Sequence, residues 1–373
     1  MRMKKLLFAT CCFAFLSGSL GAAAQKKSAA KNVLTQTLKG KSWSADNGNG
    51  TFTNPLFYDE FSDPDIIRVG EDYYLAGTTM HSVPGLVVLH SRDLVNWEFS
   101  SYCFDRFDDS DDFNLRNGKE AYGQGIWAPA IRYHNGKFYI FSNINGHGLQ
   151  VYISDSAKGP WTHHKVNGDI YDLSVLFDED GKIYAVHKYG NVTITELKPD
   201  LSGPVEGSSK VVIPEGNAMG EGHHVYKING MYYILSADYS PMGRMQCARS
   251  KSIWGPYETC VISERESYGY AAGWSVGNMG IGRPLPEDGF NFQNNKPNGL
   301  NLGCATIHQG GIVQAPDGKW WGVSMQDFNA VGRTVCLSPI TWVDGWPYFG
   351  LEKNLGRSPR TWFKPNDAVK APQ

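Results

Sequence analysis

The sequence predicts an all-β protein, a five-bladed β-propeller, and two observations carry this prediction. The composition is rich in aromatic residues and glycine, with 11 Trp, 19 Tyr, 18 Phe and 42 Gly in 373 residues, which favours many short strands over helices. A unit made of an irregular segment, an apolar strand, a hairpin turn and an aromatic strand recurs five times along the chain. Repeats with several strands each are typical of a β-propeller, in which every blade is one such unit.

Each unit has a recognisable start and a short hairpin turn between alternating strands. The units begin at Asp63, Trp127, Asp172, Glu221 and His308. The turns lie at residues 70–72, 135–136, 180–181, 229–230 and 317–318. Because the first strand of every blade lines the central channel of a propeller, these starting residues should converge around one axis.

The first unit shows how the sequence builds such a start. Pro64 fixes its own φ and cannot donate a hydrogen bond, so it belongs at the first position of a strand and holds the preceding Asp63 rigidly. The residues from Ile66 onward indicate a strand, a tight turn and a second strand. Asp63 and Asp65 could instead be ordinary turn formers and caps. However, packing alone would favour the same apolar residue at the start of every unit, and the starts are instead three acids, a Trp and a His.

The N-terminal segment of the chain indicates an exported protein. A basic segment, an apolar run and a small-residue cleavage site are typical of a signal peptide over residues 1–24. Residues 25–50 are predicted to be a flexible leader, 51–360 the propeller and 361–373 a C-terminal tail. No later apolar run approaches the ~20 residues that a membrane span needs, so we expect a soluble chain in the periplasm or outside the cell. Residues 267–303 are predicted to form a rim over the axial cleft.

The net charge and the cysteines argue against several classes of partner and site. A formal net charge of -2 gives no reason to expect nucleic acid or an anionic membrane as a partner, and a neutral polymer fits at least as well. Removal of the signal leaves five cysteines, an odd number that does not indicate a disulfide framework. Free thiols are expected, and a single disulfide bond between Cys247 and Cys260 is the alternative. No spacing of cysteine and histidine resembles a zinc site.

The motifs of the five units together resemble glycoside hydrolase family 43, the five-bladed propeller glycosidases that act on arabinose- and xylose-containing polysaccharides. The resemblance covers roughly residues 54–359. Its motifs are DPDIIRVGEDYYLA with PGLVVLHSRDLVNW, then GIWAPAIRYHNGKFYIF, DLSVLFDEDGKIYAV, EGHHVYKINGMYYIL and IHQGGIVQAPDGKWWGV. Several motifs in this order are specific, whereas any one of them alone is a weak signal.

By position, the resemblance implies that Asp63 is the general base, Asp172 an orienting and pKa-setting aspartate, and Glu221 the general acid. An inverting glycosidase needs one carboxylate to deprotonate water and one carboxylic acid to protonate the leaving oxygen, about 6.5–9.5 Å apart. A third acid near Glu221 would raise its pKa by like-charge repulsion. Asp172 could instead cap a turn, and Glu221 could simply be exposed.

The resemblance also implies residues that bind the substrate. Trp127 is similar to a sugar-stacking aromatic residue of the family, with a core Trp as the alternative. Arg333 is similar to an arginine that contacts the substrate and the aspartate equivalent to Asp172, with a surface ion pair as the alternative. Met80 and His81 stand where the family's β-xylosidases carry aromatic residues that wall the pocket. We therefore expect these two side chains to shape a different pocket.

The resemblance implies no required cofactor, and a bound calcium ion is an alternative. His308 is similar to an axial histidine that approaches a bound calcium ion through water in several relatives. A buried core histidine is an equally good interpretation of this residue.

Together these inferences predict an exported, inverting exo-glycosidase that removes terminal β-D-xylose or α-L-arabinofuranose from xylan or arabinoxylan oligosaccharides. The residues do not separate the two sugars. Endo-action on arabinan, which needs an open groove, and a non-catalytic carbohydrate-binding propeller are the alternatives. Many relatives carry a C-terminal β-sandwich that closes the site, and because this sequence ends at Gln373 we expect that domain to be missing.

Overall fold

The computed structural model describes residues 44–107, 110–217, 219–239, 242–263, 308–327, 333–356 and 361–365. The chain divides into two units, Met1–Ser44 and Ala45–Gln373, and all elements described below belong to the second. This second unit begins a few residues before the predicted boundary at residue 51. The predicted signal peptide and the predicted rim lie outside the described residues. Within the described ranges, no helix is long and apolar enough to cross a membrane.

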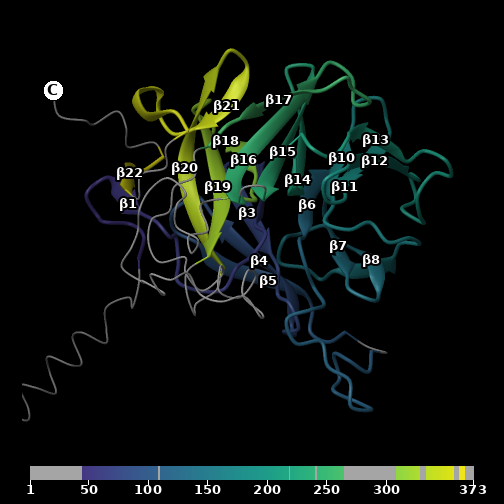
Figure 1. Ribbon diagram of the computed structural model, residues 1–373. Coiled ribbons are helices and arrows are strands. Elements are labelled where there is room, and N and C mark those ends of the chain that lie inside the picture. Colours follow the sequence, from purple (N-terminus) through teal and green to yellow (C-terminus); the bar gives the residue numbers. More distant parts are fainter. Residues whose placement is uncertain are drawn as a thin grey trace, which may run out of the picture. The chain divides into compact units, whose positions relative to one another are not determined.

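The described residues form five four-stranded sheets, which confirms the predicted all-β, five-bladed propeller (Figure 1). Blade 1 contains β2 (Asp65–Val69), β3 (Asp72–Gly77), β4 (Gly85–Ser91) and β5 (Glu98–Phe104). Blade 2 contains β6 (Ala130–His134), β7 (Lys137–Ile144), β8 (Gly148–Ser154) and β9 (Thr162–Lys165). Blade 3 contains β10 (Ser174–Phe177), β11 (Ile183–His187), β12 (Val192–Leu197) and β13 (Lys210–Ile213). Blade 4 contains β14 (Glu221–Ile228), β15 (Met231–Tyr239), β16 (Met242–Ser250) and β17 (Glu258–Val261). Blade 5 contains β18 (Ile312–Gln314), β19 (Trp320–Asp327), β20 (Arg333–Val343) and β21 (Trp346–Phe349), and the 3-10 helix η2 (Glu352–Asn354) follows it.

The predicted hairpin turns join the first two strands of every blade. In blades 2 and 4 the turn is an Asn-Gly pair, and both residues have positive φ: 49° and 79° at Asn135 and Gly136, 50° and 77° at Asn229 and Gly230. A type I′ turn needs this combination, and its twist matches that of two antiparallel strands. The turns therefore set the register in which each first strand pairs with the second.

The first strands of the blades form a closed ring. β2 contacts both β6 and β18, and β10 contacts both β6 and β14. The hydroxyl of Tyr226 on β14 accepts a hydrogen bond from the backbone N–H of Ile312 on β18 at 2.9 Å, which completes the ring. The ring brings the starts of five distant repeats to one end of the channel.

The hydrophobic core lies between neighbouring blades. Five apolar clusters fill these contacts, and each one combines side chains of two adjacent blades. Burial of one such side chain contributes about 1.5–3 kcal/mol. Fully buried members are Leu75 and Val323 between blades 1 and 5, Val88 and Ile140 between blades 1 and 2, Phe141 and Val175 between blades 2 and 3, Val186 and Ile234 between blades 3 and 4, and Leu235 and Phe349 between blades 4 and 5.

Segments from both ends of the second unit close blade 5 against blade 1. β1 (Thr51–Thr53) pairs with β22 (Thr361–Phe363), whose residues lie in the predicted tail. The side-chain amide of Asn54 donates to the carbonyl of Leu337 on β20 at 2.8 Å, and its oxygen accepts from the N–H of the same residue at 2.9 Å. The chain before blade 1 is thereby fixed to blade 5.

Asp65 is a structural hub of the ring rather than a turn former. It is 1% exposed, accepts the backbone N–H of Ile131 at 2.9 Å, and forms an ion pair with Arg132 of blade 2. These two contacts involve Oδ2 of Asp65, and Nδ1 of His224 in blade 4 lies 3.0 Å from Oδ1 of Asp65. Arg132 continues to blade 3, where it donates to the hydroxyl of Ser174 at 2.6 Å. Although burial raises the pKa of Asp65, Arg132 and His224 hold this pKa below its usual value.

Cys103, Cys247 and Cys260 are free thiols. Cys103, Cys247 and Cys336 are buried, and Cys260 is half-buried. Cys247 and Cys260 lie directly opposite each other on β16 and β17 without a disulfide bond. Cys304 lies outside the described residues.

Candidate active site

A cavity of about 360 Å³ lies where the starts of the blades converge. Four of the five predicted starting residues line it, and they come from blades 1 to 4 or from the segments directly before them. Blade 5 contributes the neighbour of the fifth start and the first residue of β20. The lining residues are Asp63, Met80, Gly123, Trp127, Ala128, Asn143, Tyr171, Asp172, Glu221, Gln309 and Arg333.

Asp63 is held on the cavity wall by contacts on both carboxylate oxygens. Its backbone has φ of 51°, a left-handed conformation in which aspartate is enriched. Oδ2 accepts a hydrogen bond from the hydroxyl of Thr78 at 2.7 Å, and this hydroxyl in turn accepts the N–H of Ala128 at 2.9 Å. Nη1 of Arg333 lies 3.4 Å from Oδ1. The side chain of Asp63 is 9% exposed, and these contacts fix its direction.

Asp172 is the second buried carboxyl group of the cavity. It is buried, and its Oδ2 accepts the backbone N–H of Gly222 at 2.7 Å. Gly222 has φ of 66°, and a Cβ atom there would lie 2.3 Å from Cγ of Gln309, so this contact needs glycine. Burial raises the pKa of Asp172 well above its usual value, and the charges of Glu221 and Asp63 raise it further.

Glu221 is the first residue of β14 and points its carboxyl group at a tyrosine. The hydroxyl of Tyr171 donates to Oε2 of Glu221 at 2.6 Å. Burial raises the pKa of Glu221, the hydrogen bond from Tyr171 opposes this rise, and the charge of Asp63 adds to it. Because Asp172 and Glu221 both have raised pKa values, this pair of carboxyl groups retains a proton to a higher pH than isolated carboxyl groups do.

Arg333 is the one cation among the residues that line this cavity. Its backbone N–H donates to Oε2 of Glu60 at 2.6 Å, which places the first residue of β20 beside the segment before blade 1. Its guanidinium group contacts Asp63, and its charge also lowers the pKa of Asp172. The arginine is therefore a site residue rather than a surface ion pair.

Only one of the two residues predicted to shape the pocket lines the cavity. Met80 lines the cavity, but His81 is exposed and is not among the lining residues. Nδ1 of His81 accepts a hydrogen bond from the N–H of Gly123 at 3.2 Å. Because Gly123 lines the cavity, the ring of His81 is connected to the cavity wall through this residue. Trp127 is half-buried and lines the cavity, and its stacking on a sugar stays a prediction.

His308 lies behind the cavity. It is 0% exposed, and its backbone pairs with Met325 through hydrogen bonds of 3.0 and 2.9 Å. Burial and the charge of Arg333 lower the pKa of His308 to about 3, so the ring is neutral at neutral pH. Within the described part of the chain, no three His, Cys, Asp or Glu side chains converge as they would around a metal ion. A calcium ion near His308 stays a prediction.

The predicted site residues did not include six residues of the site: Gly123, Ala128, Asn143, Tyr171 and Gln309, which line the cavity, and Thr78, which contacts Asp63. Tyr171 and Gln309 are neighbours of predicted starts, so the same repeat pattern indicates them. Thr78 directly follows β3, and Asn143 lies near the end of β7. Because the second strand of a blade returns to the face where the first one starts, the ends of second strands are the signal that would find them.

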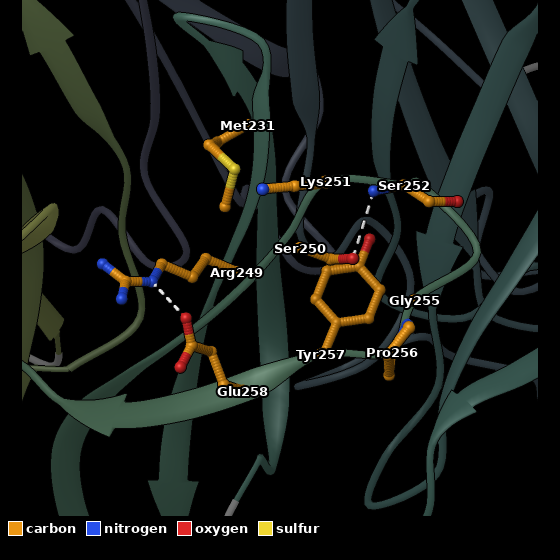
Figure 2. A pocket seen from close by; sticks show the side chains of 9 residues that line it. All are labelled: Met231, Arg249, Ser250, Lys251, Ser252, Gly255, Pro256, Tyr257 and Glu258. Atoms are coloured by element: carbon orange, nitrogen blue, oxygen red, sulfur yellow. Dashed lines mark hydrogen bonds and ion pairs between the residues drawn. The ribbon is translucent and has the colours of Figure 1, made fainter.

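A second cavity of about 390 Å³ lies on blade 4, at the opposite ends of its strands (Figure 2). Its walls come from the start of β15, the end of β16, the segment 251–257 between β16 and β17, and the start of β17. Figure 2 shows Arg249 turned toward Glu258, with Nε 2.6 Å from Oε1. Glu258 is the one acid among the residues that line this cavity, so it offers no pair of carboxyl groups for acid–base chemistry.

Comparisons with known proteins place this arrangement in a family. The sequence model described as Glycosyl hydrolases family 43 matches residues 52–269. The chain is 33% identical to a non-reducing end alpha-L-arabinofuranosidase of Bacteroides ovatus, over 85% of this chain and 56% of that protein. It is 31% identical to a putative beta-xylosidase of Xylanibacter ruminicola, over 88% of this chain and 56% of that protein.

Solved structures agree with these sequence matches. A structure described as bifunctional GH43-CE from Bacteroides eggerthii superposes with a TM-score of 0.69 and 34% identity, over 84% of this chain and 37% of that one. The chain spans little more than half the length of these two curated relatives. The family match itself covers more than half of the present sequence. The chain therefore belongs to glycosyl hydrolase family 43.

Proposed function

We propose that the chain is an inverting exo-glycosidase that removes terminal β-D-xylose or α-L-arabinofuranose from xylan- or arabinose-containing oligosaccharides. One observation carries this proposal: three carboxyl groups from blades far apart in sequence line a single cavity, and two of them have raised pKa values. The names of the relatives, a beta-xylosidase and an arabinofuranosidase, support the two sugars. The cavity of about 360 Å³ is at the small end of ligand pockets, which span about 300–1,000 Å³, and thus favours one terminal sugar over a long groove.

Asp63 acts as the general base in this proposal. Thr78 and Arg333 fix both of its oxygens, so the carboxylate can receive a proton from a water molecule along one direction. The oxygen of that water forms a bond to the anomeric carbon while the bond from this carbon to the leaving oxygen breaks. The configuration at the anomeric carbon is inverted as a result.

Glu221 acts as the general acid. Burial and the charge of Asp63 keep its carboxyl group protonated to a higher pH, so it can give its proton to the leaving oxygen as the glycosidic bond breaks. Asp172 is a positioning residue, because the N–H of Gly222 holds it directly beside the start of β14, where Glu221 lies. Trp127 and Met80 provide apolar surface for the sugar bound between these groups.

Removing the hydroxyl of Tyr171 should move the pH dependence of the reaction. The hydrogen bond from Tyr171 lowers the pKa of Glu221, so Tyr171→Phe should raise that pKa. Activity that needs protonated Glu221 disappears as the pH rises through its pKa, and the alkaline limb of the kcat/KM profile should therefore move to higher pH. Tyr133→Phe, at an exposed tyrosine of β6, is the matched control and should keep the parental profile. An unmoved limb, or one moved to lower pH, contradicts the assignment of Glu221 as the acid.

The function is tested by release of 4-nitrophenol from the β-D-xylopyranoside and the α-L-arabinofuranoside. The ratio of kcat/KM for the two substrates identifies the terminal sugar. If the folded chain releases nothing from either, the exo-glycosidase proposal is wrong. Products from linear arabinan would then indicate endo-action, and binding of sugar without products would indicate a carbohydrate-binding propeller.

We also propose that the protein is exported, on the basis of residues 1–24. The mature protein from the periplasm or culture medium should begin at Gln25, which N-terminal sequencing would show. An intact N-terminus would contradict the proposed cleavage.

A further inference from the structure

A turn at the mouth of the cavity presents an exposed aromatic side chain. The carbonyl of Ala121 accepts the N–H of Gln124 at 2.8 Å, which closes a four-residue turn. Its third residue, Gly123, has φ of 69°, as the third position of a type II turn requires. Ala121 is buried, whereas Tyr122 at the second position is 76% exposed. The turn thus anchors its first residue in the protein and directs Tyr122 into solvent.

This turn is fixed to the cavity by several contacts. Gly123 lines the cavity, and its N–H donates to Nδ1 of His81 at 3.2 Å. The ring of His81 lies against the ring of Tyr122, with 4.5 Å between the centroids and 37° between the planes. Met80, which precedes His81, pairs with Ile126 through backbone hydrogen bonds of 3.0 and 2.9 Å. Tyr122 and His81, which we call the rim platform, are therefore held in place beside the mouth.

The size of the cavity indicates what the rim platform contacts. The three carboxyl groups line this cavity, so a terminal sugar that reaches them lies inside it. The remainder of the oligosaccharide must then leave through the mouth. The C–H face of a sugar ring is apolar, and its burial against an exposed aromatic ring is favourable. The rim platform offers such a surface next to Gly123, which lines the cavity.

We propose that Tyr122, supported by His81, binds the second sugar residue of the oligosaccharide, on the leaving-group side of the bond that is cleaved. The placement of the terminal sugar in the cavity rests on the function proposed above. The rim platform should therefore favour substrates with at least two sugar residues over substrates with a small leaving group. Nothing in this role requires the hydroxyl of Tyr122, because the contact is made by the face of the ring.

The test uses dissociation constants, measured by calorimetry in a Glu221→Gln background so that the ligands are not consumed. The ligands are xylose with xylobiose, and arabinose with α-1,5-arabinobiose. Tyr122→Ala should weaken binding of the recognised disaccharide by roughly 2- to 12-fold, the range for one aromatic stacking contact. The same substitution should change binding of the matching monosaccharide by less than about twofold. Tyr122→Phe should bind the disaccharide as the background chain does.

Phe99→Ala is the matched control for the loss of an exposed aromatic ring. Phe99 on β5 is 58% exposed and lies against Tyr102 with 4.9 Å between the ring centroids, but it does not line the cavity. It should leave both dissociation constants unchanged.

The outcomes separate this inference from the proposed function. Equal disaccharide binding by the background chain and Tyr122→Ala overturns the rim platform, and so does equal weakening of monosaccharide and disaccharide. If the parental chain hydrolyses no glycoside but Tyr122→Ala weakens disaccharide binding alone, the proposed function fails and the rim platform stands. If the background chain binds none of the four sugars, the rim platform is overturned whatever the parental chain hydrolyses.

Discussion

Glu221→Gln should reduce kcat/KM on an unactivated xylo- or arabino-oligosaccharide by about 10²- to 10⁴-fold, the contribution of one positioned acid. Glutamine keeps the shape of the side chain and can still accept the hydrogen bond from Tyr171, but it has no proton to give to the leaving oxygen. 4-Nitrophenolate needs little protonation to leave. The same variant should therefore lose much less activity on the 4-nitrophenyl glycoside of the preferred sugar.

Asp63→Asn is the variant that distinguishes the acid from the base. Without a general base, activation of the attacking water fails for every leaving group. Asp63→Asn should consequently lose activity on the oligosaccharide and on the 4-nitrophenyl glycoside by similar factors. If Glu221→Gln also lost both activities equally, or Asp63→Asn spared the activated substrate, the two roles would have to be reassigned.

Asp65→Asn should lower the free energy of unfolding by about 3–5 kcal/mol, the cost of removing one partner from a buried ion pair. The substitution leaves Arg132, which is 13% exposed, without its charged partner among strands of three blades. Denaturation with urea measures the change. Asp155→Asn removes the partner of Lys137 in an exposed pair and should leave the unfolding midpoint nearly unchanged. An Asp65→Asn variant as stable as the parent would show that the hub does not hold the ring together.

The same carboxylate should make the protein sensitive to acid. The pKa of Asp65 is lower in the folded chain than in the unfolded chain, so its stabilising contribution is present above the unfolded pKa of about 3.9 and is lost as the pH falls through the folded pKa. Asp65→Asn removes this contribution at all pH values. The parent should therefore lose stability more steeply than the variant below about pH 4.

The repeat pattern was sufficient to predict the fold. Alternating strands and Asn-Gly turns are local signals, and Asn135-Gly136 and Asn229-Gly230 adopt the positive φ angles that such turns need. The convergence of the repeat starts then follows from the geometry of a propeller. For this reason the repeat starts could be predicted to lie together, and four of them line the cavity: Asp63, Trp127, Asp172 and Glu221.

Contacts that depend on loop direction or ring closure could not be predicted in this way. His81 follows Met80 directly, yet only Met80, which pairs with Ile126, lines the cavity, whereas His81 is exposed. Aspartate is a common residue in turns, so the sequence around Asp65 indicates a turn. The role of Asp65 as a hub appears only when strands of four blades meet. No local pattern in the sequence encodes such contacts.

In the proposed reaction water attacks between Asp63 and Glu221 with inversion, so the anomeric configuration of the first product distinguishes it from a retaining reaction. Proton NMR during the first minutes of hydrolysis distinguishes the α and β anomers before they equilibrate. We expect α-D-xylose to appear first from a β-D-xyloside, or β-L-arabinofuranose from an α-L-arabinofuranoside. A first product with the configuration of the substrate would contradict it, because retention requires a covalent intermediate and a carboxylate close enough to form it.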